Sequence, residues 1–175
     1  MSLNLAQKQA VVAEVAEVAS SALSAVAAEY RGLTVAQMTE LRVKARDAGV
    51  AIRVVKNTLA RRAFEGTEFE CMGSALVGPL VLAFSQRDPG SAARVVRDFV
   101  KSNDKLVPKV IAIGGELVDA AQIERVASLP TREEALSLLM AVMKAPIEKF
   151  VRTLNEPTAK MVRTFAAIRD QKQAA

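Results

Sequence analysis

The feature of this sequence that most constrains its fold is an eleven-residue repeat near the C-terminus. Residues 146–154, PIEKFVRTL, align with residues 157–165, PTAKMVRTF, and the Pro, Lys, Val, Arg and Thr positions are identical. Eleven residues make about three turns of an α-helix, so each copy presents the same face. The repeat therefore predicts a long helix after residue 131, with an apolar stripe along one side.

The apolar stripe extends beyond the two copies of the repeat. One step of eleven residues towards the N-terminus, residues 135–145 keep only the apolar positions, which makes two clear units and one degenerate unit. Pro146 and Pro157 each remove a helical hydrogen bond and are expected to kink or segment the helix. The stripe residues expected to bind a partner protein are Leu139, Met140, Met143, Ile147, Phe150, Val151, Leu154, Met161, Val162, Phe165 and Ile168.

Such a stripe can be buried in three alternative ways. An extended helix cannot bury it alone, and prolines at matching places in a repeat favour repeated copies of a bound partner. In the second alternative the stripe folds back on the rest of the chain, and in the third the basic helix lies on a membrane. The absence of tryptophan, the two prolines and the lack of a polybasic cluster argue against the membrane.

The first 130 residues predict an α/β fold, because segments of helical periodicity alternate with short apolar and β-branched runs. We expect a compact α/β sandwich head, with a mixed sheet flanked by helices, over residues 1–130, and a long C-terminal helical tail over residues 131–175. The expected head elements are helices over 3–22, 34–49, 58–65, 88–99 and 119–128, and strands over 24–30, 50–55, 76–84, 109–115 and 116–118.

Several local signals define these elements further. Thr34 and Gln37 have the spacing of a capping box, and Asn57 is expected to cap the helix that follows it. The β-branched run 50–55 predicts a strand covered on both faces. Gly78-Pro79 predicts a bulge or a sheet edge.

The sequence lacks the usual machinery of an enzyme. Histidine is absent and Cys71 is the only cysteine, which leaves no cysteine–histidine couple and no thiolate zinc site. Residues 73–79 superficially resemble a phosphate-binding loop but lack its Lys-Ser/Thr pair, and Pro79 stands where a helix should start. Glu133 and Glu134 fall in the first turn of the tail helix, which favours negative charge. We therefore expect no enzymatic activity, no metal and no cofactor.

The sequence also predicts where the protein is found. Lys8 and Glu14 interrupt the N-terminal apolar stretch, so no signal peptide is expected. No window reaches the about eighteen uncharged apolar residues of a membrane span. A single cysteine suits a reducing cytosol. We expect a cytoplasmic protein with no membrane partner.

Positive charge gathers at the two ends of the chain. Residues 1–65 carry nine Lys and Arg against six Asp and Glu, and residues 131–175 carry eight against five, while the middle is close to neutral. This layout is typical of proteins that bind a polyanion. The alternative, that these charges only solvate ordinary helix and strand faces, is equally open at this point.

The densest cluster of positive side chains is RVVKNTLARR, residues 53–62. A strand that ends at Lys56 and a helix that starts at once leave free backbone amides beside that lysine, which suits phosphate groups. Because Tyr30 is the only ring of an exposed type, base stacking is not expected. This geometry selects Arg53, Lys56, Arg61 and Arg62 as RNA-binding candidates, with Arg53 leaving the buried face of its strand. Arg31 and Gly32, expected at the end of a neighbouring strand, and Lys8 are outer members.

Several stretches, in order along the chain, carry a family resemblance. They are Gly32-Leu-Thr-Val35, the stretch 53–62, Gly78-Pro79 with Ala83-Phe84-Ser85, and the ending VRTFAAIRD over 162–170. Together they resemble the bacterial stalk-base proteins, the tenth protein of the large ribosomal subunit, over essentially the whole chain.

This resemblance implies a structural role in the large subunit. The head would bind large-subunit ribosomal RNA at the factor-binding centre, beside the eleventh large-subunit protein. The tail would hold dimers of the acidic stalk protein, which recruit translation GTPase factors and support their GTP hydrolysis. Family members also repress their own operon by binding its leader RNA. Matched within the motif, the family's RNA-binding corner corresponds to Arg53, Lys56, Asn57, Thr58, Arg61 and Arg62.

The number of stalk dimers depends on how the degenerate unit is interpreted. We expect three dimers, one for each eleven-residue unit, or two if residues 135–145 are only structural helix. The rival interpretation is a free RNA-binding regulator whose tail packs on itself or on the head.

Overall fold

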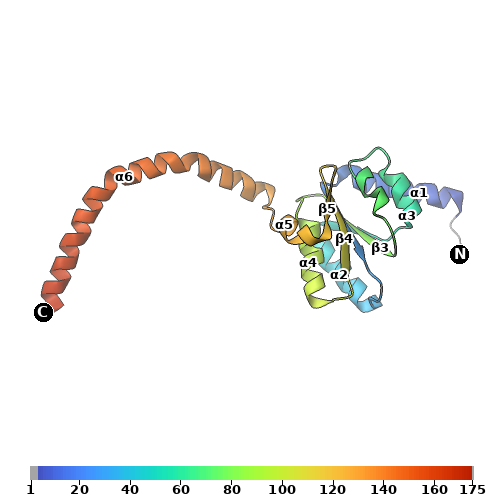
Figure 1. Cartoon of the computed structure of the whole chain (residues 1–175), viewed down its shortest axis with the longest axis horizontal. Coiled ribbons are helices and arrows are strands. Elements are labelled where there is room, and N and C mark those ends of the chain that lie inside the picture. The colour runs from blue at the N-terminus through green and yellow to red at the C-terminus, as the bar shows by residue number, and fades with distance from the viewer. Residues whose placement is uncertain (1–3, 175) are drawn as a thin grey trace. The chain divides into compact units, whose positions relative to one another are not determined.

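The computed structural model describes residues 4–174, and two compact units can be distinguished, Met1–Thr131 and Arg132–Ala175. We refer to them as the head and the tail. The head combines a five-stranded sheet with helices, and the tail is one long helix (Figure 1). The α/β fold class with a helical tail is therefore confirmed.

The elements follow the predicted order closely. The α-helices are α1 (Leu5–Ser21), α2 (Val35–Asp47), α3 (Asn57–Phe64), α4 (Ser91–Ser102), α5 (Ile123–Ala127) and α6 (Arg132–Ala174), the 3-10 helices are η1 (Glu70–Ser74) and η2 (Ala120–Gln122), and the strands are β1 (Ser24–Glu29), β2 (Val50–Arg53), β3 (Leu80–Ser85), β4 (Val107–Ile113) and β5 (Glu116–Asp119). The predicted start of the first helix at residue 3 lies outside the described residues.

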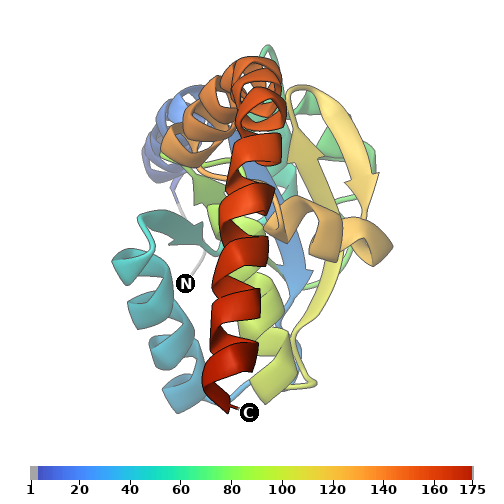
Figure 2. The same cartoon turned by 90° about the vertical axis from the view of Figure 1, so that its left-hand side faces the viewer.

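The sheet has the strand order β2-β3-β1-β4-β5, and every neighbouring pair is antiparallel. The expected mixed sheet is therefore wrong in this detail. Helical crossovers do connect strands that run in the same direction, β1 with β2 and β3 with β4. However, β3 inserts between the first two and β1 between the second two, so that no parallel strands are adjacent. The β4–β5 hairpin closes one edge of the sheet, in yellow and pale orange in Figure 2.

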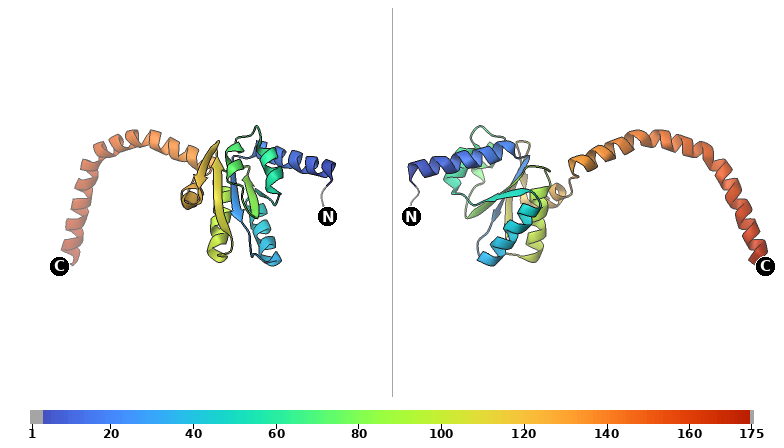
Figure 3. Two further views of the ribbon diagram at one scale, coloured as in Figure 1. Left: turned by 45° about the vertical axis from the view of Figure 1, so that its right-hand side comes forward. Right: turned by 180° about the vertical axis from the view of Figure 1, so that it is seen from behind.

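Two hydrophobic clusters, one on each face of the sheet, make the head a three-layer structure. Helices α1 and α3, together with η1, cover one face, and helices α2, α4 and α5 cover the other (Figure 3). The first cluster is centred on three phenylalanine rings whose centroids lie 6.1–6.3 Å apart, and the second on a fourth phenylalanine. These buried rings are Phe64, Phe69 and Phe84 in the first cluster and Phe99 in the second.

Two strand predictions need correction. The run 50–55 was expected to be covered on both faces, but β2 is an edge strand and only Val50 in it is buried. Its β-branched residues are explained by the pleated surface they share with β3. The strand expected from residue 76 begins at Leu80, because Gly78 has a φ of +93° and precedes a proline, which places a turn there. The register shift in the sheet lies instead between Ala27 and Ala28 of β1.

Two helix N-caps were predicted, and one of the two predictions is confirmed. The capping box of α2 is confirmed, since Thr34 Oγ1 accepts from Gln37 N and Gln37 Oε1 accepts from Thr34 N. The prediction for Asn57 is wrong. This residue lies inside α3, the N-cap is Lys56 and makes no side-chain cap, and Asn57 Nδ2 donates instead to Gly78 O at 2.9 Å. The Asn57 side chain therefore makes a tertiary contact instead of capping its own helix.

The tail is a single helix of 43 residues in which both prolines, Pro146 and Pro157, are accommodated. Segmentation of the helix was therefore a wrong expectation. The helix curves along its length instead (Figure 1), as expected where prolines remove backbone hydrogen bonds and crowd the preceding turn. Among the described residues, no helix combines the length and apolarity needed to cross a bilayer.

Candidate RNA-binding corner and docking helix

The β2–α3 junction places Lys56 at the N-cap of α3, where Leu59 N and Ala60 N donate to Lys56 O at 2.8 and 3.0 Å. The first amides of an α-helix have no intrahelical acceptor. Side chains of Lys56 and Thr58 are exposed and that of Asn57 is half-buried. The predicted combination of a lysine with a helix N-terminus is therefore present at this corner.

An open pocket of about 440 Å³ adjoins this corner. Tyr30, at the end of β1, contributes an aromatic wall, and Tyr30 N donates to Pro79 O at 3.3 Å. This proximity could not be predicted from the sequence, because the segments that contain Tyr30 and Pro79 are brought together only by the antiparallel register of β1 and β3. The lining residues are Tyr30, Val54, Val55, Lys56, Asn57, Thr58, Gly78, Pro79 and Leu80.

Arg53 leaves the buried face of β2 as predicted, but it is already paired. Its guanidinium nitrogen lies 2.5 Å from Glu14 Oε1 of α1, and both side chains are about half exposed. The pair contributes little stability, since exposed ion pairs are typically worth about 0–1 kcal/mol. Glu14 nevertheless offsets part of the positive charge that the sequence assigned to this corner.

Arg61, an RNA-binding candidate of the basic stretch, also makes two hydrogen bonds within the head. Arg61 Nε donates to Gly73 O at 2.8 Å, and its terminal nitrogen donates to Leu76 O at 2.9 Å. Both acceptors are backbone carbonyls of the segment 73–76, which runs from the end of η1 towards β3. The guanidinium therefore fastens this segment to α3, beside the bond from Asn57 to Gly78 O. Arg62, one residue further on, is exposed.

The three outer candidates, Arg31, Gly32 and Lys8, are exposed. Arg31 and Gly32 follow β1, which β3 separates from β2, so the expectation that they end a neighbouring strand is wrong. A Cβ at Gly32 would lie 3.6 Å from Lys105 Cδ, which identifies Lys105 as a cation that sequence reasoning missed. Lys8 lies on the exposed first half of α1.

On α6, the apolar stripe is exposed throughout. All eleven predicted docking residues are between 50% and 70% exposed. Equivalent positions in the two clear units also make the same local bond. Thr153 Oγ1 donates to Phe150 O at 2.7 Å, and Thr164 Oγ1, eleven residues later, donates to Met161 O at 2.8 Å. The sequence repeat is therefore a repeat of local structure as well.

The described residues hold no group of three or more His, Cys, Asp or Glu side chains that could bind a metal ion. Cys71 is half-buried, and its Sγ lies 3.7 Å from Glu68 O. The arrangement of the head offers cations and amides around a pocket, and the tail offers apolar side chains at a regular spacing. This chemistry is that of binding surfaces.

Comparison with known proteins gives full-length matches. The family model described as "Ribosomal protein L10" matches residues 3–101, and that of the "Ribosomal protein uL10 C-terminal region" matches twice, over residues 129–155 and 153–175. The chain is 66% identical over 174 residues to large ribosomal subunit protein uL10 of Thioalkalivibrio sulfidiphilus, with 99% of each chain covered. It is 67% identical over 175 residues to the uL10 protein of Methylococcus capsulatus, with each chain covered completely.

Proposed function

Since this chain belongs to the uL10 family of large-subunit ribosomal proteins, we propose that it forms the base of the ribosomal stalk. The chain is a structural ribosomal protein and not an enzyme, and it acts in the cytoplasm on the ribosome. In this proposal the head, residues 1–130, binds large-subunit ribosomal RNA beside the eleventh large-subunit protein. The tail, residues 131–175, anchors dimers of the acidic stalk protein, which recruit translation GTPase factors.

The observation that carries the proposal is the exposed stripe of α6. Within residues 132–174 there is no second element against which Phe150 or Phe165, 64% and 65% exposed, can be buried. Burying about four large apolar side chains per unit would contribute on the order of 6–12 kcal/mol before ordering costs are subtracted. A helical partner surface that meets each unit supplies this burial, and the basic charge of the tail favours an acidic partner.

The number of docked dimers can be tested directly. The tagged full-length protein would be captured from its host's lysate at moderate salt and examined by native mass spectrometry. We expect one copy with three dimers of a small acidic protein, one dimer for each unit. Two dimers would retain the function but assign residues 135–145 to structural helix. Recovery of the bare monomer, even at low salt, would contradict the docking proposal.

The proposed RNA surface of the head is centred on Lys56, with Thr58, Arg62 and the first amides of α3 around it. In the part of the chain that the structure describes, Lys56 and Arg62 have no ion-pair partner, so their charge is available to phosphates. Arg53 is a weaker contributor because Glu14 neutralises it. Arg61 and Asn57 support the surface by holding the segment 73–78 in place.

Replacing one of these cations tests the RNA surface. For Lys56→Gln, we expect weaker binding to protein-free large-subunit ribosomal RNA. The slope of log affinity against log salt should become shallower by about 0.7–0.9. Lys101→Gln on α4 removes the same charge from an exposed site elsewhere in the head and serves as the control. Equal effects of the two substitutions would show that only net charge matters.

Removing the tail distinguishes the stalk base, an adaptor between RNA and partner proteins, from the alternative of a free RNA-binding regulator. A chain ending at residue 131 contains both hydrophobic clusters of the head. If this fragment keeps its RNA affinity and stability but loses every protein partner, the adaptor is supported. A loss of head stability on removal of α6 would favour a self-packed regulator. Binding of the fragment to the leader RNA of its own operon would add an autogenous repressor role.

A further inference from the structure

A second basic groove lies in the head, between α2 and the edge strand β2. It has a volume of about 590 Å³, and its lining residues come from these two elements and the residue that follows. The side chains that line it include three arginines and no acidic residue. The groove is lined by Arg42, Arg46, Val50, Ala51, Ile52, Arg53 and Val54.

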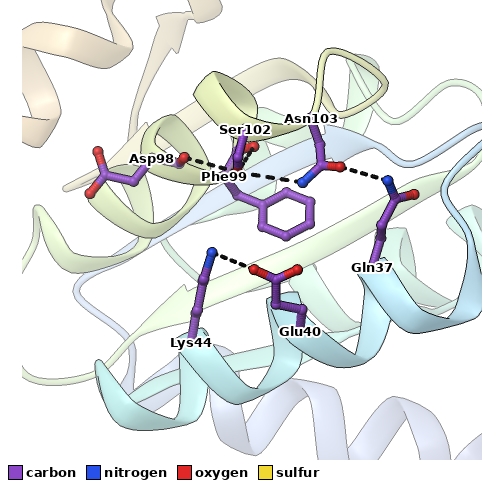
Figure 4. Close-up of polar contacts among 7 residues, drawn as sticks. All are labelled: Gln37, Glu40, Lys44, Asp98, Phe99, Ser102 and Asn103. Atoms are coloured by element: carbon purple, nitrogen blue, oxygen red, sulfur yellow. Dashed lines mark hydrogen bonds and ion pairs between the residues drawn. The ribbon is translucent and has the colours of Figure 1, made fainter.

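The orientation of α2 is fixed by its other two faces, which keeps these arginines on the groove. Leu41 and Ala45 are buried against the sheet. The α4-facing side carries Gln37, Glu40 and Lys44 (Figure 4). There Gln37 Nε2 donates to Asn103 Oδ1 at 2.6 Å, and Lys44 Nζ lies 2.7 Å from Glu40 Oε1 and 5.5 Å from the centre of the Phe99 ring. Rotation of α2 that would withdraw the arginines would break the bond from Gln37 to Asn103 and expose the buried Leu41.

Charge in the groove is largely uncompensated. Across residues 4–173, for which side chains are described, neither Arg42 nor Arg46 has an ion pair or a side-chain hydrogen bond. Both side chains are exposed, and they are separated by one turn of α2, which puts them on the same side of the helix. Arg53 is the exception, because Glu14 pairs with it from α1.

The groove and the Lys56 pocket adjoin the same residue, since Val54 lines both. The chain turns back between α2 and β2, so that Arg46 lies near the start of β2 and Arg42 lies further along it. The cations therefore follow the edge strand in the order Arg46, Arg42, Arg53 and Lys56. The chain from Val50 to Lys56, which is the four residues of β2 and three more, spans at most about 20 Å, which is long enough for several successive phosphates.

We propose that this groove is a second RNA-backbone site, in which Arg42 and Arg46 hold phosphates of the same RNA strand that reaches the Lys56 pocket. The inference rests on the proposed RNA-binding role of the head and extends it to residues outside the 53–62 stretch. Guanidinium groups suit this task because each can donate two parallel hydrogen bonds to a phosphate. RNA is favoured over an acidic peptide pairing with the free edge of β2, because the cations continue past the end of that strand to Lys56.

The test compares Arg42→Gln/Arg46→Gln with Lys101→Gln/Arg125→Gln, in the full-length chain. The second pair removes the same charge from exposed positions on α4 and α5. Binding to protein-free large-subunit ribosomal RNA would be measured as a function of salt, with unfolding midpoints confirming that each variant is folded. We expect the groove variant to bind at least about tenfold more weakly and to lose about 1.5 units of salt slope, as two lost phosphate contacts require. The control should retain the wild-type slope.

Arginine footprinting gives a second readout that does not depend on affinity. The protein would be treated with phenylglyoxal with and without RNA, and modified peptides would be identified by mass spectrometry. Protection of Arg42 and Arg46, with Arg125 equally modified in both samples, supports the proposal. Unchanged affinity and slope in the groove variant, with no protection, would overturn it. The same result with a poly-glutamate peptide protecting the groove would assign the site to peptide instead.

Failure of this inference is distinguishable from failure of the proposed function. If Lys56→Gln weakens RNA binding and the groove variant does not, RNA binding by the head stands and only the groove is excluded. If the wild-type chain itself shows no affinity for the ribosomal RNA, both proposals fail together. Arg42→Lys/Arg46→Lys, which keeps the charge but not the paired donors, should bind more tightly than the glutamine variant and less tightly than wild type.

Discussion

The four phenylalanines of the head are at most 1% exposed, whereas Phe150 and Phe165 in the tail are 64% and 65% exposed. Both regions carry apolar side chains at regular intervals. In the head a sheet with helices on both faces encloses them in two clusters, while in the tail a single helix has no second layer. Burial of apolar surface drives folding and association alike. The head therefore completes its own core, and the apolar stripe of α6 has none.

The same contrast extends to the polar side chains. In the head, Arg61, Asn57 and Gln37 bond across the fold to segments distant in sequence. In the tail, the threonines Thr153 and Thr164 bond to the preceding turn of their own helix. Long-range bonds hold a surface in one shape. Local bonds leave the helix free to present each unit independently.

The largest difference in head stability is expected from truncating one phenylalanine side chain in each region. Phe84→Ala should destabilise the head by about 3–5 kcal/mol, because it opens a cavity in the cluster with Phe64 and Phe69. Phe150→Ala, the same change on α6, should leave head stability within about 0.5 kcal/mol. Urea unfolding of the full-length chain measures both. Equal effects would mean that Phe150 belongs to the core of the head.

Binding of the stalk protein, unlike head stability, should depend on the phenylalanines of the tail. Phe150→Asp places a charge in the middle of one apolar unit, and loss of such an anchor typically costs about 2 kcal/mol or more of binding. We expect native mass spectrometry to show one stalk dimer fewer than for the wild type. Gln171→Asp, which adds the same charge at an exposed position off the stripe and outside both clear units, is the control. Unchanged stoichiometry in Phe150→Asp would exclude the stripe as the docking surface.

Arg61→Lys tests whether a basic residue of the 53–62 stretch serves the fold of the head. Lysine keeps the charge but cannot donate to Gly73 O and Leu76 O together, so stability should fall by about 1–3 kcal/mol. The salt slope of RNA binding should stay at its wild-type value, because no phosphate contact is lost. Arg62→Lys, on the exposed neighbour, should change stability little. A reduced slope in Arg61→Gln, which removes the charge, would make this arginine a phosphate ligand.

The smallest effect is expected from the helix caps. Thr34→Ala removes the side chain that accepts from Gln37 N and should cost the head about 1 kcal/mol. Thr153→Ala removes a threonine that bonds only within α6, and thermal unfolding of the head should not detect it. A similar loss from both substitutions would mean that tail and head unfold as one unit.

Local patterns were predicted well where the interacting groups are close in the sequence. Thr34 and Gln37 are three residues apart, so their capping box could be identified without a fold. Asn57 was assigned to the same role and failed, because Gly78 O, 21 residues away, takes its side chain. Arg61 likewise bonds to carbonyls of Gly73 and Leu76, which its place in the basic stretch did not indicate. Neither partner can be identified from spacing, since both depend on how η1 and β3 return to α3.

The sequence by itself determined the α/β class of the head, the long helical tail with its eleven-residue units, and the Lys56 corner. These depend on periodicity, on the repeat and on a short motif, which are properties of neighbouring residues. Only the tertiary structure decided the antiparallel strand order, the meeting of Tyr30 with Lys56, and the groove that joins Arg42 to Arg53. The physical reason is that strand pairing is long-range. Register and order arise from the packing of whole layers, and they bring together side chains whose separation along the chain carries no signal.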